Sequence, residues 1–224
     1  MRSGFSTTTR SSTTSSGACI AGDLEGERLA VRAATTTTWA AFRERYPDGL
    51  VLQPVEDAAS EAASDDDEPA EIDYDDRPYA DYFDADGFGL AAHRGADETR
   101  EWGLDLEPKT VVLGLETGGD ALGFPLPRVE AAGGVVYETV GDVDVVAFAT
   151  DGGLHAFENP GYEFEQAGGS EEGDTERFGF RADGTVWDGV TGDAADGREL
   201  ERLPARRLFA FTWRDDHGAD AFYS

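Results

Sequence analysis

Short apolar, β-branched runs separated by Gly- and Asp-containing turns fill the region from Thr110 to Phe180 and continue toward the C-terminus. Such runs predict strands joined by hairpin turns, the first of them at Thr117–Asp120. A short helix is expected at 127–133, which begins with Pro and ends with Gly. The pattern therefore predicts a mainly β (α+β) fold, an antiparallel β-rich unit with a few short helices. The expected strands are Val111–Leu115, Ala121–Leu126, Val135–Val140, Val143–Thr150, Leu154–Glu158, Phe178–Arg181 and Thr185–Asp188.

The region before these strands predicts an amphipathic helix over Trp39–Tyr46. Thr38 is a suitable N-cap, and Pro47 ends the helix. Aromatic residues at the first, fourth and eighth positions of this segment fall on one helical face. Two short strands around a turn are expected within Ile20–Ala34, and a further strand at Leu50–Leu52.

The two ends of the chain carry the same pattern at a constant offset of 171 residues, the separation of Leu29 and Leu200. The C-terminal part of a repeating unit, here called its tail, therefore occurs twice. The remainder of the unit, here called its body, occurs only once, between the two tails. We interpret the chain as the remnant of a two-unit duplicated domain that has lost most of its first unit. The matching residues are Gly26-Glu27-Arg28-Leu29 with Gly197-Arg198-Glu199-Leu200, Phe42 with Trp213, Arg43 with Arg214, and Leu52 with Tyr223.

Composition along the chain predicts four segments. Residues 1–18 are rich in Ser and Thr and form either a disordered segment or a mis-called start or frameshifted reading. We favour the second interpretation, because the half-unit begins just after this segment. Residues 19–54 would be the tail of the truncated first unit. Residues 55–76 are acidic and poor in large apolar side chains, which predicts a linker. Residues 77–224 would be the second β-rich unit.

The chain is strongly acidic. Its formal net charge is −29, and Lys109 is its only lysine. This balance is typical of a protein adapted to molar salt, where the Debye length falls to roughly 3 Å and carboxylate repulsion is screened. We therefore interpret most Asp and Glu residues as a solvated halophilic surface. The same charge argues against nucleic acid and anionic membrane surfaces as partners, because both require clustered Lys and Arg.

The sequence offers little for localisation or redox chemistry. No apolar stretch approaches the roughly 20 residues of a membrane span, and residues 1–18 lack the apolar region of a signal peptide. We leave the localisation unknown beyond a high-salt environment. Cys19 is the only cysteine, which excludes an intrachain disulfide and a CxxC site. We interpret it as a small buried or half-buried residue.

Two acidic clusters invite comparison with metal sites. Asp84-Ala85-Asp86-Gly87 resembles half a calcium loop, but this alignment places Tyr82 first and His93 last, where Asp and Glu are required. Asp215-Asp216-His217 has no second histidine at helical spacing. We therefore predict no metal site, and no cofactor.

Catalytic motifs are equally scarce. The chain has no phosphate loop and no nucleophile elbow. The best acid–base candidates are His155, Asp183 and Asp188, which flank turns, although an Asp before Gly is an ordinary turn former. We predict no catalytic and no cofactor-binding residue. A His155 imidazole within hydrogen-bond distance of either carboxylate, inside an enclosed pocket, would overturn that prediction.

The order of motifs along the chain resembles the domain of unknown function 3179 family, from about residue 20 to the end. The motifs are Trp39-Ala40-Ala41-Phe42-Arg43, Val111-x-Leu113-Gly114, Ala121-x-x-Phe124-Pro125-Leu126, Val140-Gly141, Ala156-Phe157, Asp183-Gly184-Thr185-Val186-Trp187-Asp188 and Leu200-x-x-Leu203-Pro204. The first resembles the family's mid-section and the others its second half. The resemblance implies a duplicated, mostly β domain of unknown biochemical function, some of whose members are exported or lipid-anchored.

The resemblance also implies a Cys-Pro-x-Cys strand motif in the first half of the family's domain. The equivalent strand here, Val146–Gly152, has no cysteine. Our leading hypothesis is a non-catalytic, halophilic, β-rich binding or scaffold fragment. The alternatives are half of an enzyme or redox/metal module whose Cys-containing first unit is missing upstream, and a calcium-binding adhesion-type module. The missing first unit is the one partner that the sequence suggests.

We predict that the folded state requires high ionic strength, because the self-repulsion of a chain with net charge −29 is unscreened in dilute buffer. Circular dichroism across a KCl series should show the thermal midpoint rising with salt. A midpoint that is the same at low and molar KCl would contradict the halophilic interpretation.

Overall fold

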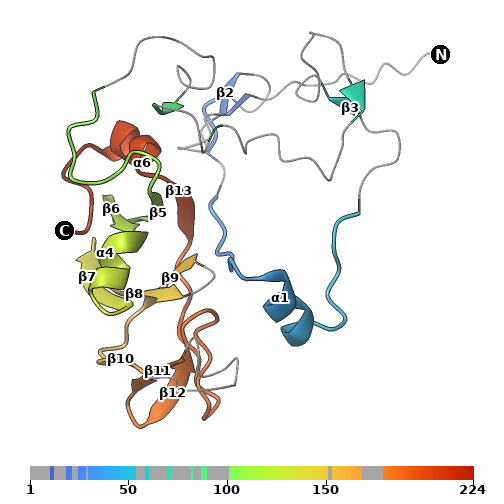
Figure 1. Cartoon of the computed structure of the whole chain (residues 1–224), viewed down its shortest axis with the longest axis vertical. Coiled ribbons are helices and arrows are strands. Elements are labelled where there is room, and N and C mark those ends of the chain that lie inside the picture. Colours follow the sequence, from blue (N-terminus) through green and yellow to red (C-terminus); the bar gives the residue numbers. More distant parts are fainter. Residues whose placement is uncertain are drawn as a thin grey trace. The chain divides into compact units, whose positions relative to one another are not determined.

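The computed structural model describes residues 25–28, 30–53, 82, 87–89, 101–150, 153–167 and 179–224, with the backbone of four short N-terminal strands. These four are β1 (Ser11–Ser12), β2 (Cys19–Ala21), β3 (Ala59–Ser60) and β4 (Ala70–Glu71). The chain falls into two compact units: one is Thr38–Glu101, and the other combines Met1–Thr37 with Trp102–Ser224. The larger unit carries most of the sheet structure (Figure 1).

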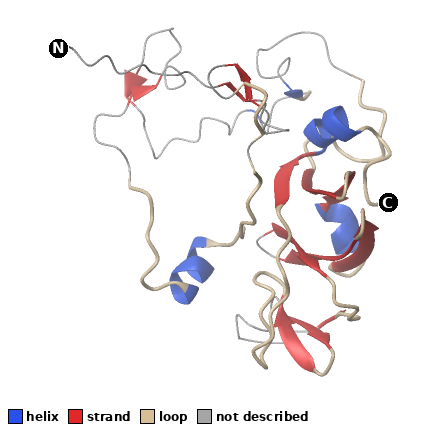
Figure 2. Cartoon of the chain, turned by 180° about the vertical axis from the view of Figure 1, so that it is seen from behind, coloured by secondary structure: helices blue, strands red, loops and turns tan. Residues whose placement is uncertain are grey.

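Three antiparallel, three-stranded sheets follow one another along the larger unit (Figures 1 and 2). They have the strand orders β13-β5-β6, β7-β8-β9 and β10-β11-β12. The strands are β5 (Val111–Thr117), β6 (Asp120–Pro125), β7 (Val135–Val140), β8 (Val143–Thr150), β9 (Gly153–Glu158), β10 (Glu165–Gln166), β11 (Gly179–Ala182), β12 (Thr185–Asp188) and β13 (Ala205–Phe209). The helices are α1 (Trp39–Arg45), α4 (Leu126–Ala131) and α6 (Ala210–His217). The predicted mainly β fold with short helices is confirmed.

Local signals account for these elements well. The Thr117–Asp120 turn joins β5 to β6 with Thr117 opposite Asp120, and β7 and β8 have the predicted bounds. In α1 the Thr38 hydroxyl oxygen accepts a hydrogen bond from the Ala41 backbone N–H at 3.2 Å, as expected of an N-cap.

Two predicted strands are wrong. The segment 30–34 forms no strand, and β2 pairs with β1. Residues 50–52 also form no strand. The residues 171 positions later have the backbone partners that a strand requires: the Leu203 N–H donates to the Ala156 carbonyl at 3.0 Å, and Phe222 forms a parallel bridge with Gly123.

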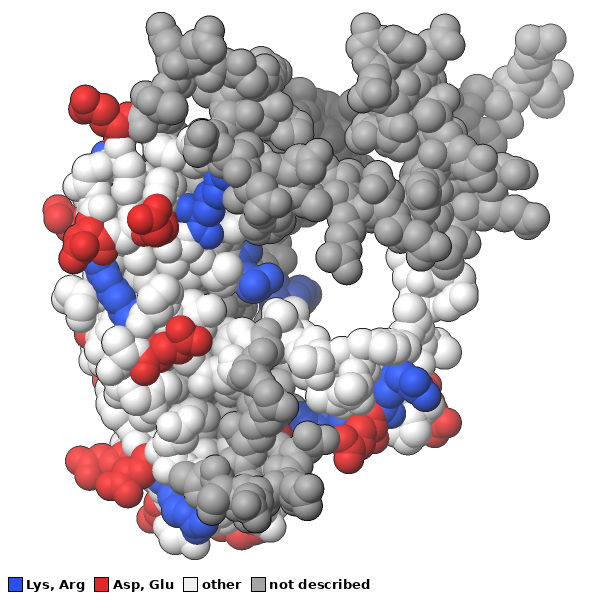
Figure 3. Space-filling model, in the orientation of Figure 1, with Lys and Arg blue, Asp and Glu red and all other residues white. Residues whose placement is uncertain are grey.

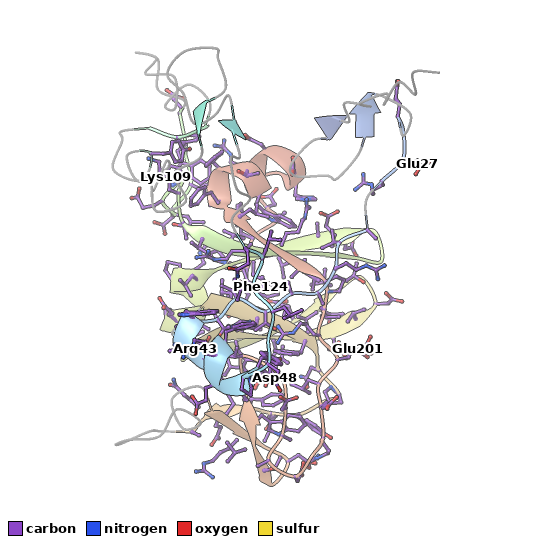
Figure 4. The ribbon with its side chains drawn as sticks, turned by 90° about the vertical axis from the view of Figure 1, so that its right-hand side faces the viewer. Glu27, Arg43, Asp48, Lys109, Phe124 and Glu201 are labelled. Atoms are coloured by element: carbon purple, nitrogen blue, oxygen red, sulfur yellow. The ribbon has the colours of Figure 1, made fainter. Side chains whose placement is uncertain are left out.

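Two of the sheets contribute side chains to a core on each face, because side chains alternate between the two faces of a strand. The first core lies between the sheets β13-β5-β6 and β7-β8-β9 and includes Phe124, which Figure 4 labels. Its buried residues are Leu113, Leu115, Phe124, Val129, Val136, Val140, Val145, Ala147, Leu154 and Ala156. The second core lies on the opposite face of β8 and β9, toward β11 and β12. Its members are Val146, Phe148, Phe157, Phe164, Phe180, Ala182, Trp187, Ala194 and Leu200.

The third core fixes α6 and the C-terminal tail to the outer face of the β5–β6 hairpin. It consists of Val112, Ala210, Trp213 and Phe222. Gly114 and Gly123 are cross-strand partners on that face, and the Trp213 indole occupies the space that their side chains would fill. A Cβ at Gly114 would lie 2.3 Å from Trp213 Cζ3, and one at Gly123 would lie 2.6 Å from Trp213 Nε1. Glycine inside a strand here marks a close approach of another group.

The Trp213 indole also organises the chain end. Its Nε1–H donates to the Ala221 carbonyl at 2.7 Å, and the Gly123 N–H donates to the same carbonyl at 2.9 Å. The Tyr223 N–H then donates to the Gly123 carbonyl at 2.9 Å. The tail is thus held along β6 by backbone hydrogen bonds that the indole helps to position.

We predict that Gly114→Ala lowers the free energy of unfolding by roughly 2–3 kcal/mol, because the added methyl group overlaps the Trp213 ring. Chemical denaturation in molar KCl measures this. In a Trp213→Phe background the same substitution should cost at least about 1 kcal/mol less, since the smaller ring leaves room. The control is Gly119→Ala. The added methyl group has no atom within 4 Å there, and the φ is +92°, so this variant measures the cost of backbone strain without a steric overlap. Equal costs of Gly114→Ala in both backgrounds would contradict the predicted contact.

Candidate functional site

Among the residues that the structure describes, His155 is a titratable residue that is almost completely buried and has a strongly lowered pKa. It lies on β9 opposite Phe148 of β8, is only 2% exposed, and is the buried polar residue among these cores. Strand alternation sends Leu154 and Ala156 into the first core, so His155 and Phe157 face the second. The local sequence thus places an imidazole among aromatic side chains.

Burial and charge keep the His155 imidazole neutral. Burial is the largest cause that lowers its pKa, the nearby Arg202 guanidinium lowers it further, and the Asp188 carboxylate raises it by a smaller amount, to a net value of about 4. Among the residues that the structure describes, its Nε2 has no hydrogen-bond partner.

Arg202 is the residue near His155 that the sequence analysis missed. Its guanidinium lies 4.5 Å from the centre of the Phe157 ring, and its Nη2 donates a hydrogen bond to the Val190 carbonyl. Arg202 also forms an antiparallel bridge with Phe157. The signal that could have identified it is its place two residues after Leu200, because strand alternation puts residues two apart on the same face as this apolar side chain.

Asp188 closes the turn that follows β12. Its Oδ1 accepts hydrogen bonds from the Val190 N–H at 2.8 Å and the Thr191 N–H at 3.1 Å, and its backbone carbonyl accepts from the Gly192 N–H at 2.7 Å. This is an Asx-type turn, in which the side chain replaces a backbone acceptor. The turn brings Gly192, at a φ of +82°, under the Phe157 ring, where a Cβ would lie 2.5 Å from Cε1.

Asp183 belongs to a different cluster. It begins the turn between β11 and β12 at a φ of 45° and pairs with Arg198 at 2.5 Å. The Arg198 guanidinium also pairs with Asp196 at 2.8 Å and lies over Trp187 and Tyr162, 5.2 and 5.5 Å from their ring centres. The hydrogen bond from Arg198 lowers the pKa of Asp196, and both carboxylates raise the pKa of Arg198. The structure therefore brings His155 and Asp188 close electrostatically, whereas Asp183 serves an exposed ion pair.

The metal candidates have other roles or lie outside the described residues. His217 packs on Trp213 with ring centres 3.9 Å apart, and burial lowers its pKa. Its Nε2 lies 3.5 Å from Glu116 Oε1 but without hydrogen-bond geometry, and the Arg206 guanidinium holds that carboxylate. No three His, Cys, Asp or Glu residues of the described ranges could jointly hold a metal ion. Of the calcium-like segment, the residues Asp84, Asp86 and His93 lie outside those ranges, as does the side chain of Cys19.

We predict that His155 makes the fold sensitive to mild acid. Its pKa is about 4 in the folded state and 6.5 in the unfolded state, so the unfolded chain binds the additional proton between these values. The stabilisation is complete above about pH 6.5 and is lost as the pH falls toward 4, by up to about 3 kcal/mol. Denaturation of the wild type and His155→Leu across this range should show the wild type losing more stability. Parallel pH profiles would contradict a buried, neutral imidazole.

Comparison with known proteins identifies one relationship. No curated protein and no solved structure matches the chain. A family model described as protein of unknown function (DUF3179) matches residues 6–220, which is nearly the whole chain and begins within the Ser- and Thr-rich segment. The chain therefore belongs to the DUF3179 family of proteins of unknown function.

Proposed function

We propose that the chain is a non-catalytic, halophilic binding or scaffold fragment, equivalent to the second half of its family's domain with the tail of the first half. The observation that carries this proposal is the state of His155. A general acid or base must reach the proton that it transfers, whereas this imidazole is 2% exposed and lies among aromatic side chains. A lowered pKa in an accessible cleft would indicate catalysis. Here burial and Arg202 account for the shift.

The other candidates support the same proposal, because each has a structural task. Asp188 closes a turn, Asp183 neutralises Arg198, and His217 packs against Trp213. On the face that Figure 3 shows, Asp and Glu side chains are spread over the described surface with Lys or Arg side chains between them, which suits solvation in concentrated salt. Among the described residues, no helix has the length and apolar character needed to span a membrane.

The duplication is supported by the helices. The α1 helix begins at Trp39 and α6 at Ala210, which differ by the same 171 residues as the sequence repeat. The ring pair one turn apart also recurs: Phe42 and Tyr46 in α1 correspond to Trp213 and His217 in α6. Two unrelated segments would have no reason to share both the start and the ring spacing. The predicted segment boundaries remain part of this proposal.

The test measures the accessibility of the His155 imidazole. Diethyl pyrocarbonate is added to the folded chain in molar KCl, and the modified histidines are identified by mass spectrometry. A structural His155 should stay unmodified under folded conditions and react fully after denaturation in urea. Rapid modification of His155 in the folded chain would instead favour the alternative of an enzyme or redox module.

A further inference from the structure

The α1 helix and the residues after it expose an apolar surface, which we define as residues 39–52. Trp39 stacks on Phe42 and Phe42 lies against Tyr46, each pair with ring centres 5.5 Å apart. Trp39 is 58% exposed, Tyr46 52% and Leu52 95%. Large apolar side chains gathered on one short segment mark an interaction site more often than an ordinary surface.

The second copy of the tail shows what covers such a surface. At the constant offset, Phe42 corresponds to Trp213, which is fully buried on the glycines of the β5–β6 hairpin. Val51 is 47% exposed, whereas its counterpart Phe222 is 9% exposed and bridges to Gly123. The same pattern is therefore buried where it meets a hairpin with facing glycines, and exposed at residues 39–52.

The surface is already formed without its cover. The Thr38 N-cap and the stacked rings fix the start and one face of α1. Gly49 lies beneath Phe42, since a Cβ there would be 2.9 Å from Phe42 Cζ. A partner would consequently meet an ordered aromatic face, which reduces the entropy cost of binding.

We propose that residues 39–52 are a docking surface for an antiparallel β-hairpin whose two strands carry a facing glycine pair, as Gly114 and Gly123 do in β5–β6. The glycines would admit the Phe42 ring against the hairpin backbone. The inference rests on the proposed binding role and names its partner by structural class. A second copy of this chain is a poor occupant, because its own glycine pair is covered by Trp213.

Arg43 adds a second point of recognition. Its counterpart Arg214 donates a hydrogen bond to the Trp102 carbonyl at 2.5 Å, with the guanidinium 5.0 Å from the Trp102 ring centre. In α1, Arg43 lies 6.0 Å from the ring centre of Trp39, an exposed side chain of the same helix. A partner with an aromatic residue before its hairpin would offer Arg43 a backbone carbonyl and a ring, the two groups of Trp102 that Arg214 contacts.

The test supplies the hairpin in the same molecule. An additional copy of residues 109–126 is joined through a flexible linker to the N-terminus of the full chain, and amide hydrogen exchange of residues 39–52 is measured in molar KCl. The matched control carries Gly→Val at both glycine positions of the added hairpin only. The intact hairpin should slow exchange in α1 about tenfold or more relative to this control, and Phe42→Asp should remove the difference.

Equal exchange of residues 39–52 with either added hairpin would overturn the docking proposal. Protection in the unmodified chain that rises with protein concentration would also overturn it, by showing a second copy as the occupant. Neither result bears on the accessibility of His155. A failure of the docking proposal is therefore distinguishable from a failure of the non-catalytic proposal.

Discussion

The stacking of the Trp213 indole on the Gly114–Gly123 pair is the contact on which the larger unit depends. It allows α6 to approach the hairpin backbone and positions the Ala221 carbonyl, which accepts hydrogen bonds from both the indole and β6. The outer face of the β5–β6 hairpin is thereby covered, while its inner face packs into the first core. Because the Trp213 indole lies against this hairpin face, a side chain at Gly114 or Gly123 would overlap the ring.

The same principle of double burial explains the chemistry of the unit. The sheet β7-β8-β9 lies between the first and second cores, so the β9 residues 153–157 are all buried, His155 among them. A histidine in that position is held neutral by its surroundings and by Arg202. The lowered pKa of His155 is therefore a consequence of the layered architecture.

Much of the fold could be predicted from sequence because its signals are local. The strands β7 and β8 and the cap of α1 follow from β-branched runs and from one threonine hydroxyl. The predicted strands at 30–34 and 50–52 were wrong because a strand requires a pairing partner, which the residues 171 positions later have in β9 and Gly123. The burial of His155 could not be predicted from the sequence either, because it depends on which faces of the sheet other segments cover. Arg202 shares this difficulty, because it meets His155 only through the packing of distant segments.

The central claim is that the Trp213 ring lies flat against both glycines, and nuclear magnetic resonance measures this most directly. An aromatic ring over a glycine shifts the α-proton that faces it strongly upfield. In molar KCl, one α-proton each of Gly114 and Gly123 should be shifted in this way, and both shifts should disappear in Trp213→Leu. Resonances at ordinary β-strand positions in the wild type would contradict the account.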